Sequence, residues 1–271
     1  MTARIERVVV ALNAVSETRA PIETAVRLAA RWQARLHGVF IEDDNVLRFA
    51  ALPFARQVSL GAGVETLTLQ QVERQLHAFA ERARRDLERA ARRLGVEWSF
   101  DVVRGAAVAG ASESDFVVTG AASRPVGGHF RVEYHWWSMV HPSATAFLLA
   151  SRDWGTPGSI VALLEKRDPA AERLLDAAAQ VAEAGGGRLI VVCPAELAAD
   201  EEFGTWLGRR LARHAAPVEI DLAPADPAAL IRRVVELECR LVAVSAEDAR
   251  SRPENLRALL GGIGCDALVV R

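Results

Sequence analysis

The sequence predicts two similar α/β domains in tandem, each built around a parallel β-sheet. Short, continuously apolar segments alternate with longer segments of helical periodicity, the pattern of parallel strands covered on both faces. The same order of segments begins again after residue 157. With 51% hydrophobic and 25% charged residues, the 271-residue chain has the composition of a globular protein that buries a core.

In the first half the predicted elements begin at residue 7. The segment 18–35 carries apolar residues at Ile22, Val26 and Ala29, which form a helical stripe. The segment 96–103 alternates apolar and polar residues, as a strand does. We predict strands at 7–12, 36–41, 96–103, 116–119 and 146–149, and helices at 18–35 and 65–94.

Two connections in the first half are irregular. Residues 42–65 form a long insertion that is too apolar for a free loop, with Phe49, Phe54 and Val58 among its residues. We expect it either to fold over the sheet or its crevice as a lid, or to project as a partner-binding arm. Residues 104–115 are few for a parallel crossover, so we expect a rudimentary helix there and an under-covered sheet face.

The second half repeats this order after a linker. Residues 151–158 contain the Gly and Pro residues expected between domains, so we divide the chain into domains 1–151 and 158–271. We predict strands at 159–164, 189–192, 217–220, 241–244 and 267–270, and helices at 169–185, 202–214, 225–238 and 254–261.

Charge and composition narrow the classes of function. The 33 basic and 35 acidic residues give a net charge of −2, so we expect no nucleic-acid or anionic membrane partner. No apolar run reaches the roughly 18–20 residues that span a bilayer, and the first residues lack a signal-peptide layout. Cys193, Cys239 and Cys265 have neither disulfide nor metal spacing, and we expect them to be reduced. These features predict a cytoplasmic protein.

The two halves also share sequence details. The opening strands Val10-Ala11-Leu12-Asn13 and Val161-Ala162-Leu163-Leu164 match, and each half ends with an apolar strand, a long loop, a helix and a final strand. In these features the chain resembles tandem members of the universal stress protein family, a bacterial stress-response family. The resemblance implies two Rossmann-like (adenine nucleotide α-hydrolase-like) domains, each a five-stranded parallel sheet of order 3-2-1-4-5 with helices on both faces.

The resemblance also implies an assembly. Single-domain members of the family commonly dimerise through the last strand. We therefore expect an intramolecular pseudo-dimer in which residues 145–150 pair with residues 266–270. A homodimer and an unidentified protein partner are further expectations.

Nucleotide-binding members of the family have an Asp after the first strand and a Gly-x2-Gly-x9-Gly-Ser/Thr loop after the fourth. The glycines let the backbone approach phosphates, which bind to oriented N–H groups. In the first half, Asn13 stands at the Asp position, Gly120 is kept, and Ser123 replaces the second glycine. Glu133-Tyr134 replaces the closing pair, and its carboxylate would repel phosphate by on the order of 1 kcal/mol. This resemblance implies a degenerate ligand pocket at Asn13, Gly120 and Ser123.

The second half departs further from the motif. Leu164 stands at the Asp position, and Ser245 and Asp248 replace the first two glycines. The following segment is about five residues short. We therefore predict no cofactor, and keep ATP as the alternative ligand of the first half.

Two other groups of residues could carry chemistry. His129 and Glu133 have the i,i+4 spacing of metal ligands, but no third ligand follows, and we interpret this aromatic stretch as packing rather than a metal site. Six arginines between residues 82 and 93 could form a basic patch. The i,i+4 pairs Glu81–Arg85, Arg82–Asp86 and Glu88–Arg92 instead indicate a solvated, ion-paired helix face.

We find no nucleophile–base arrangement and predict no catalytic residues. The preferred function is a non-catalytic regulatory or binding protein of the universal stress type with degenerate nucleotide sites. The alternative is an ATP- or AMP-binding protein, weakly hydrolytic at most, that uses the first-half pocket alone.

Overall fold

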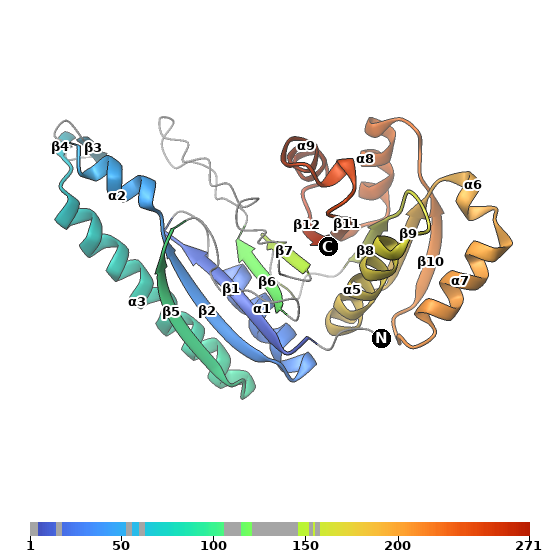
Figure 1. Cartoon of the computed structure of the whole chain (residues 1–271), viewed down its shortest axis with the longest axis horizontal. Helices are drawn as coiled ribbons and strands as arrows, with labels where there is room; N and C mark the ends of the chain where they lie inside the picture. Colours follow the sequence, from blue (N-terminus) through green and yellow to red (C-terminus); the bar gives the residue numbers. More distant parts are fainter. Residues whose placement is uncertain are drawn as a thin grey trace.

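The computed structural model describes residues 5–14, 18–52, 56–59, 63–105, 115–120, 146–151, 154 and 158–271. Ten of the described strands form one sheet in the order β10-β9-β8-β11-β12-β7-β6-β1-β2-β5 (Figure 1). The first-half strands are β1 (Arg7–Asn13), β2 (Arg35–Glu42), β5 (Trp98–Arg104), β6 (Asp115–Gly120) and β7 (Ala146–Ala150). The second-half strands are β8 (Ser159–Leu163), β9 (Leu189–Cys193), β10 (Val218–Leu222), β11 (Cys239–Ser245) and β12 (Asp266–Val270).

In the ten-stranded sheet, all strand pairs within each half are parallel, and the order is 3-2-1-4-5 when the strands that each half gives to this sheet are counted along the chain. The predicted α/β fold class is therefore confirmed. The halves join through their last strands, because β7 pairs antiparallel with β12, from Leu149 opposite Ala267 to Ala146 opposite Val270. This pairing of β7 with β12 is the strand contact that the family resemblance implies.

Helices cover the sheet on two sides. On one side lie α1 (Arg19–Trp32), α3 (Leu69–Leu94), α5 (Pro169–Gly185) and α7 (Glu201–Leu211), whose buried residues share one continuous core. On the other side of the second half lie α8 (Pro227–Glu236) and α9 (Pro253–Ile263). The short helix α6 (Ala195–Ala198) and a 3₁₀ turn at Ala249–Ser251 complete the second half.

The opposite side of the first half is different. Val9, Val39 and Val117 are buried there, but no described helix of the first half packs on them. The short crossover falls largely on residues 106–114, which lie outside the described residues. The rudimentary helix therefore stays a prediction.

Local signals set the ends of the helices. The capping box of Thr68 and Gln71 starts α3 at Leu69, later than the predicted residue 65. Gln33 takes a left-handed conformation (φ 53°) and ends α1, so the predicted helix to residue 35 was too long. The strand β2 begins at Arg35 in its place.

The insertion after β2 has structure of its own. It forms α2 (Asp44–Ala50) and a hairpin of β3 (Arg56–Ser59) and β4 (Gly63–Thr66), apart from the main sheet at one end of α3 (Figure 1). Leu47 and Ala50 of α2 pack against Val72 and Leu76 of α3, and Ala14 contacts the same cluster. The helix α2 is thus anchored on α3 and is not a free arm, and the lid over the crevice stays a prediction.

Trp154 of the linker packs against Arg240 of the second half. The Arg240 guanidinium lies 4.5 Å from the centre of the Trp154 ring, and its Nη1 donates to the Trp154 carbonyl at 2.9 Å. Trp154 and Arg240 are both buried, and burial lowers the pKa of Arg240. None of the helices in the described ranges is long and apolar enough to cross a membrane.

Candidate functional site

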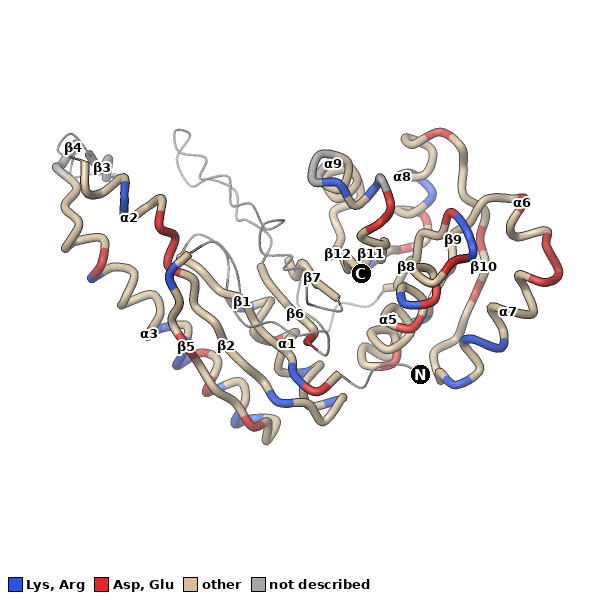
Figure 2. Tube along the Cα trace, viewed as in Figure 1, with Lys and Arg blue, Asp and Glu red and all other residues tan. Residues whose placement is uncertain are grey.

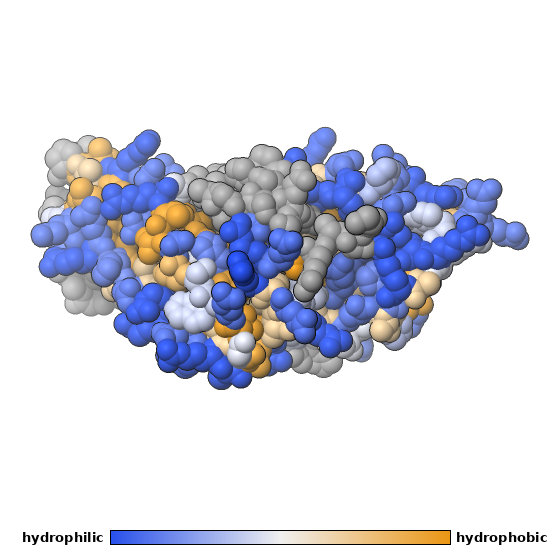
Figure 3. Space-filling view, turned by 60° about the horizontal axis from the view of Figure 1, so that its bottom comes forward, coloured by the Kyte–Doolittle hydropathy of each residue, from blue (hydrophilic) through white to orange (hydrophobic). Residues whose placement is uncertain are grey.

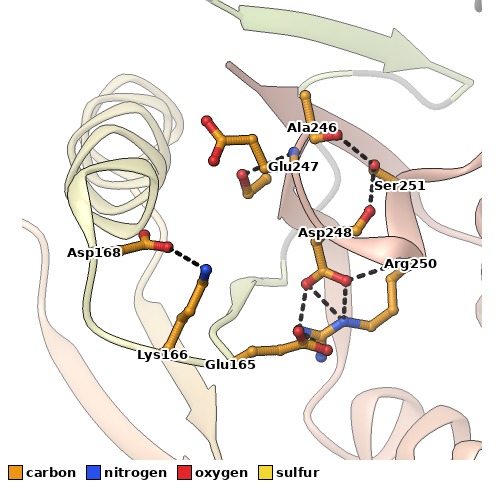
Figure 4. Close-up of polar contacts among 9 residues, drawn as sticks. Glu165, Lys166, Asp168, Ala246, Glu247, Asp248, Arg250 and Ser251 are labelled. Atoms are coloured by element: carbon orange, nitrogen blue, oxygen red, sulfur yellow. Dashed lines mark hydrogen bonds and ion pairs between the residues drawn. The ribbon is translucent and has the colours of Figure 1, made fainter.

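The carboxyl ends of β8 and β11 meet in the second half. These are the first and fourth strands of that half, and they are adjacent in the sheet. In open α/β sheets, ligands bind at such a switch point because the loops that follow the two strands diverge to opposite faces. The loops here are residues 164–168 and 246–252, and we call this place the second-half switch point (Figure 4).

The backbone amides of the second loop, residues 246–252, mostly form hydrogen bonds within the chain. Most of its amide groups donate to acceptors within the chain, at distances of 2.6–3.2 Å: Ala246 N to Val270 O, Glu247 N to Ser245 Oγ, Asp248 N to Ser245 O, Arg250 N to Asp248 Oδ1 and Ser251 N to Asp248 O. The Ser251 hydroxyl also donates to the carbonyls of Ala246 and Asp248. A phosphate loop needs free N–H groups, and most of those in this loop already donate to acceptors of the chain.

A carboxylate lies inside the same loop. The Asp248 side chain is only 7% exposed, and the Arg250 guanidinium holds both of its oxygens, Nε at 3.0 and 2.9 Å and Nη2 at 2.5 Å from Oδ2. Arg250 Nη2 also lies 3.3 Å from Glu165 of the first loop. The cation that could attract an anionic ligand is therefore neutralised by two carboxylates of the chain itself.

The start of α5 is occupied in a similar way. The Asp168 carboxylate accepts from the Ala171 amide at 2.8 Å, which caps the helix, and Lys166 Nζ lies 3.1 Å from Asp168 Oδ2. The Ala171 hydrogen bond, with help from Lys166, lowers the pKa of Asp168. The hydrogen bond with Asp168 raises the pKa of Lys166. A helix N-terminus that could hold a phosphate thus already holds a carboxylate.

The space between the two loops is small. A cavity of about 110 Å³ remains between the 164–168 and 246–248 segments, below the roughly 300 Å³ at which small-molecule pockets begin. A larger pocket of about 750 Å³, here called the β8–β10 pocket, lies beside it at the carboxyl ends of β8, β9 and β10. Its walls are largely apolar, with Leu230 and Ile231 from α8 and Leu259 from α9. Glu165, Glu196 and Arg250 are the charged residues that line it.

In the first half, two of the predicted site residues come together. Asn13 ends β1 and Gly120 ends β6, and these neighbouring parallel strands pair with Ala11 opposite Thr119. Asn13 is 4% exposed. Ser123 lies outside the described residues, as do Glu133 and the histidine-rich stretch from His129 to His141. Among the residues that the structure does describe, no group of three or more His, Cys, Asp or Glu side chains could hold a metal ion.

Sequence reasoning found Ser245 and Asp248 but missed Glu165 and Arg250. The signal for Arg250 was present, because a basic residue two positions after an acidic one in a turn can fold back onto it. Glu165 directly follows Leu164, the residue at the family's Asp position. Its contact with Arg250 joins two loops that lie far apart in sequence, and no local pattern predicts it.

No protein-family model and no curated protein matches this sequence. Solved structures do match. A universal stress protein from Archaeoglobus fulgidus aligns with a TM-score of 0.59 at 10% identity, covering 97% of this chain and 98% of that chain. A protein described as a universal stress protein from Pseudomonas aeruginosa UCBPP-PA14 aligns at 0.58 with 14% identity, covering 98% and 93%. A protein of unknown function from Pseudomonas aeruginosa PAO1 also aligns at 0.58 with 14% identity, covering 98% and 92%. Over the length of both its halves, this chain has the fold of the universal stress proteins.

Proposed function

We propose that this protein is a non-catalytic binding protein of the universal stress type, with a second-half switch point that is closed to phosphate. One observation carries the proposal: the amides of the 246–251 loop donate to acceptors inside the chain. A phosphate could enter only by breaking several of these hydrogen bonds. The likeness in fold supports the stress-response role.

Electrostatics act in the same direction. Asp248, Glu165 and Glu247 bring three carboxylates to this edge of the sheet, and Arg250 already pairs with the first two. Arg173 pairs with Glu247 at 2.9 Å. Two unit charges about 4 Å apart interact by about 4 kcal/mol at the effective dielectric near a protein surface, so a phosphate placed here would be repelled by the acids.

The β8–β10 pocket is the part of this edge that remains open for binding. Its apolar walls and the acidic side chains Glu165 and Glu196 favour an uncharged or cationic ligand with a flat apolar body. A regulatory protein of this kind would change its partner contacts when the pocket fills. Its ligand would be a small molecule without phosphate.

The alternative function, ATP or AMP binding by the first half, rests on Asn13, Gly120 and Ser123. The neighbouring positions of Asn13 and Gly120 support it. The division into domains 1–151 and 158–271, the pseudo-dimer and the cytoplasmic location belong to the same proposal.

Mass spectrometry of the small molecules released on denaturing the purified protein tests the proposal. We expect no stoichiometric nucleotide in the supernatant, and an absorbance ratio at 260 and 280 nm typical of protein alone. A stoichiometric adenine nucleotide would overturn the proposal in favour of the alternative. A neutral or cationic aromatic molecule would identify the ligand of the β8–β10 pocket.

A further inference from the structure

A second type of site lies on the helical side of the first half. The helices α1 and α3 pack side by side, and a groove of about 570 Å³ runs between them, which we call the α1–α3 groove. Buried Asn13 and Phe40 form part of its lining at the sheet, and Ile22 contributes from α1. This volume lies within the range of small-molecule pockets.

Five of the arginines of α3 divide into two sets. Basic and acidic residues alternate along this helix (Figure 2). Arg84 and Arg92 pair with Glu81 and Glu88 on the outer ridge, and the predicted Glu88–Arg92 pair is confirmed at 2.6 Å. The predicted pairs Glu81–Arg85 and Arg82–Asp86 do not form, since Glu81 pairs with Arg84 and Asp86 with Arg89. The second set, Arg82, Arg89 and Arg93, lines the groove.

The α1–α3 groove carries an excess of positive charge. Arg19 of α1 joins the three arginines of α3, whereas only Glu23 and Asp86 contribute carboxylates. Arg93 pairs with Glu23, and Arg89 lies 3.3 Å from Asp86. Arg19 and Arg82 are exposed and form no ion pair within the part of the chain that the structure describes. The guanidinium groups of Arg19 and Arg82 are therefore available to bind an anion.

An aromatic ring lies beside one of them. Phe79 is 45% exposed, and it precedes Arg82 by three residues, so the two side chains neighbour each other on the helix surface. Hydrophobic side chains show between hydrophilic ones on the half of the molecule that includes α3 (Figure 3). An exposed ring next to an arginine suits a ligand that combines a flat apolar body with a negative charge.

The second half provides an internal comparison. A groove of about 630 Å³ lies at the equivalent place between α5 and α7, and Trp206 and Arg209 repeat the spacing of Phe79 and Arg82. There the ring is covered by the chain itself, because Arg167 lies 5.4 Å from its centre.

Two cations of the second groove are paired with a buried carboxylate. Arg210 and Arg213 bind the buried Asp176 at 2.6 and 2.5 Å, and Arg210 also contacts Glu172 at 2.8 Å. The second groove thus has its ring covered and two of its arginines paired, whereas Phe79, Arg19 and Arg82 of the first groove are exposed.

We propose that the α1–α3 groove binds a small planar anion, such as an aromatic carboxylate or aromatic phosphate. Arg19 and Arg82 pair with its charged group, and its ring lies on Phe79. The groove shares Asn13 with the predicted first-half pocket, but its cations and its exposed ring come from α1 and α3. It does not depend on the function proposed above.

Titration of the full chain with phenyl phosphate, followed by ligand-observed NMR, tests the proposal. We expect saturable binding with a dissociation constant on the order of 0.1–1 mM, typical of an exposed site, that weakens as salt is added. The double variant R19Q/R82Q should bind roughly tenfold more weakly, because both charge-assisted contacts are lost. Benzoate should compete with phenyl phosphate, and phenol should not.

Arg85→Gln is the matched control. Arg85 is an exposed arginine of the same helix that does not line the groove, so this variant removes one positive charge from α3 outside the groove and should bind as the parent does. Phe79→Ala should remove the preference for phenyl phosphate over inorganic phosphate. An absence of saturable binding, or equal weakening in R85Q and R19Q/R82Q, would overturn the proposal. All substituted residues are largely exposed, and circular dichroism verifies that the variants fold.

Discussion

Arg250 donates from Nε to both carboxylate oxygens of Asp248, at 3.0 and 2.9 Å. The two residues belong to one turn, and their contact places an ion pair at Asp248, where the resemblance to nucleotide-binding members of the family predicts a glycine. The backbone amide of Arg250 also donates to the Asp248 carboxylate, at 2.8 Å. The turn is thereby stabilised in a form in which most of its amides already donate to acceptors of the chain.

Replacing Asp248 with Ala tests the role of this contact. The change leaves the Arg250 guanidinium and its amide without their acceptor, so we expect a loss of about 1–3 kcal/mol in the free energy of unfolding. We also expect inorganic phosphate to raise the Tm of D248A but not of the parent. Thermal unfolding with and without phosphate measures both effects. Glu236→Ala, which removes an exposed carboxylate 3.0 Å from Arg233, is the control that should show no phosphate effect. Equal phosphate responses in D248A and the parent would contradict this account of the loop.

The pairing of β7 with β12 predicts the behaviour of a fragment. Residues 1–151 alone would expose β7 as an edge strand with Phe147, Leu148 and Leu149, and such edges self-associate. We expect this fragment to aggregate or to form dimers in analytical ultracentrifugation. Residues 158–271 alone would expose β12 as an edge strand, and we expect that fragment to behave in the same way. A stable, well-folded monomer of either fragment would argue against this role for the last strands.

Gly38 marks a close approach of α3 to the sheet. A Cβ at this position would lie 2.5 Å from Leu87 Cδ2 and 2.7 Å from Phe100 Cδ2, and Leu87 is fully buried. Gly38→Ala should therefore overpack the core and lower the free energy of unfolding by about 1–3 kcal/mol. Urea denaturation measures this loss, and Gly204→Ala, at a helical glycine with open space around it, is the comparison that should not be destabilised. Equal free energies of unfolding for G38A and the parent would contradict the close packing of α3 on the sheet at this position.

The three thiols should be unreactive in the native protein. The hydrogen bond with Cys265, together with burial, raises the pKa of Cys239, and burial raises that of Cys193. A raised pKa leaves less thiolate at pH 7–8, and the thiolate is the reactive form. We expect all three thiols to react with Ellman's reagent only after denaturation. Rapid reaction of one equivalent under native conditions would contradict the buried environment.

The fold could be predicted from the sequence because its main signals are local. The apolar run Arg7–Asn13 and its counterpart at Ser159–Leu163 are buried on both faces, which requires continuous hydrophobicity rather than alternation. The helix α2 and the hairpin of β3 and β4 were not predicted. They are short, and α2 is stabilised by its contact with Val72 and Leu76 of α3, which no local pattern reveals.

The candidate site could be predicted in part. The resemblance implies glycines at the positions of Ser245 and Asp248, and their absence from this sequence predicts a site without phosphate affinity. The means by which the loop closes depends on tertiary contacts, above all that of Arg250 with Glu165. The α1–α3 groove was hidden because Arg82 and Arg84 are near neighbours in sequence yet belong to different faces of the helix.

Calorimetric titration of the full chain with ATP and magnesium near neutral pH tests the central claim most directly. The satisfied amides and the Asp248 carboxylate predict no saturable heat that corresponds to a dissociation constant below about 10 μM, which is equivalent to roughly 7 kcal/mol of binding free energy. Weaker heat that disappears in R19Q/R82Q would belong to the α1–α3 groove. A dissociation constant below about 10 μM that persists in R19Q/R82Q would contradict the account and show that a switch point binds nucleotide.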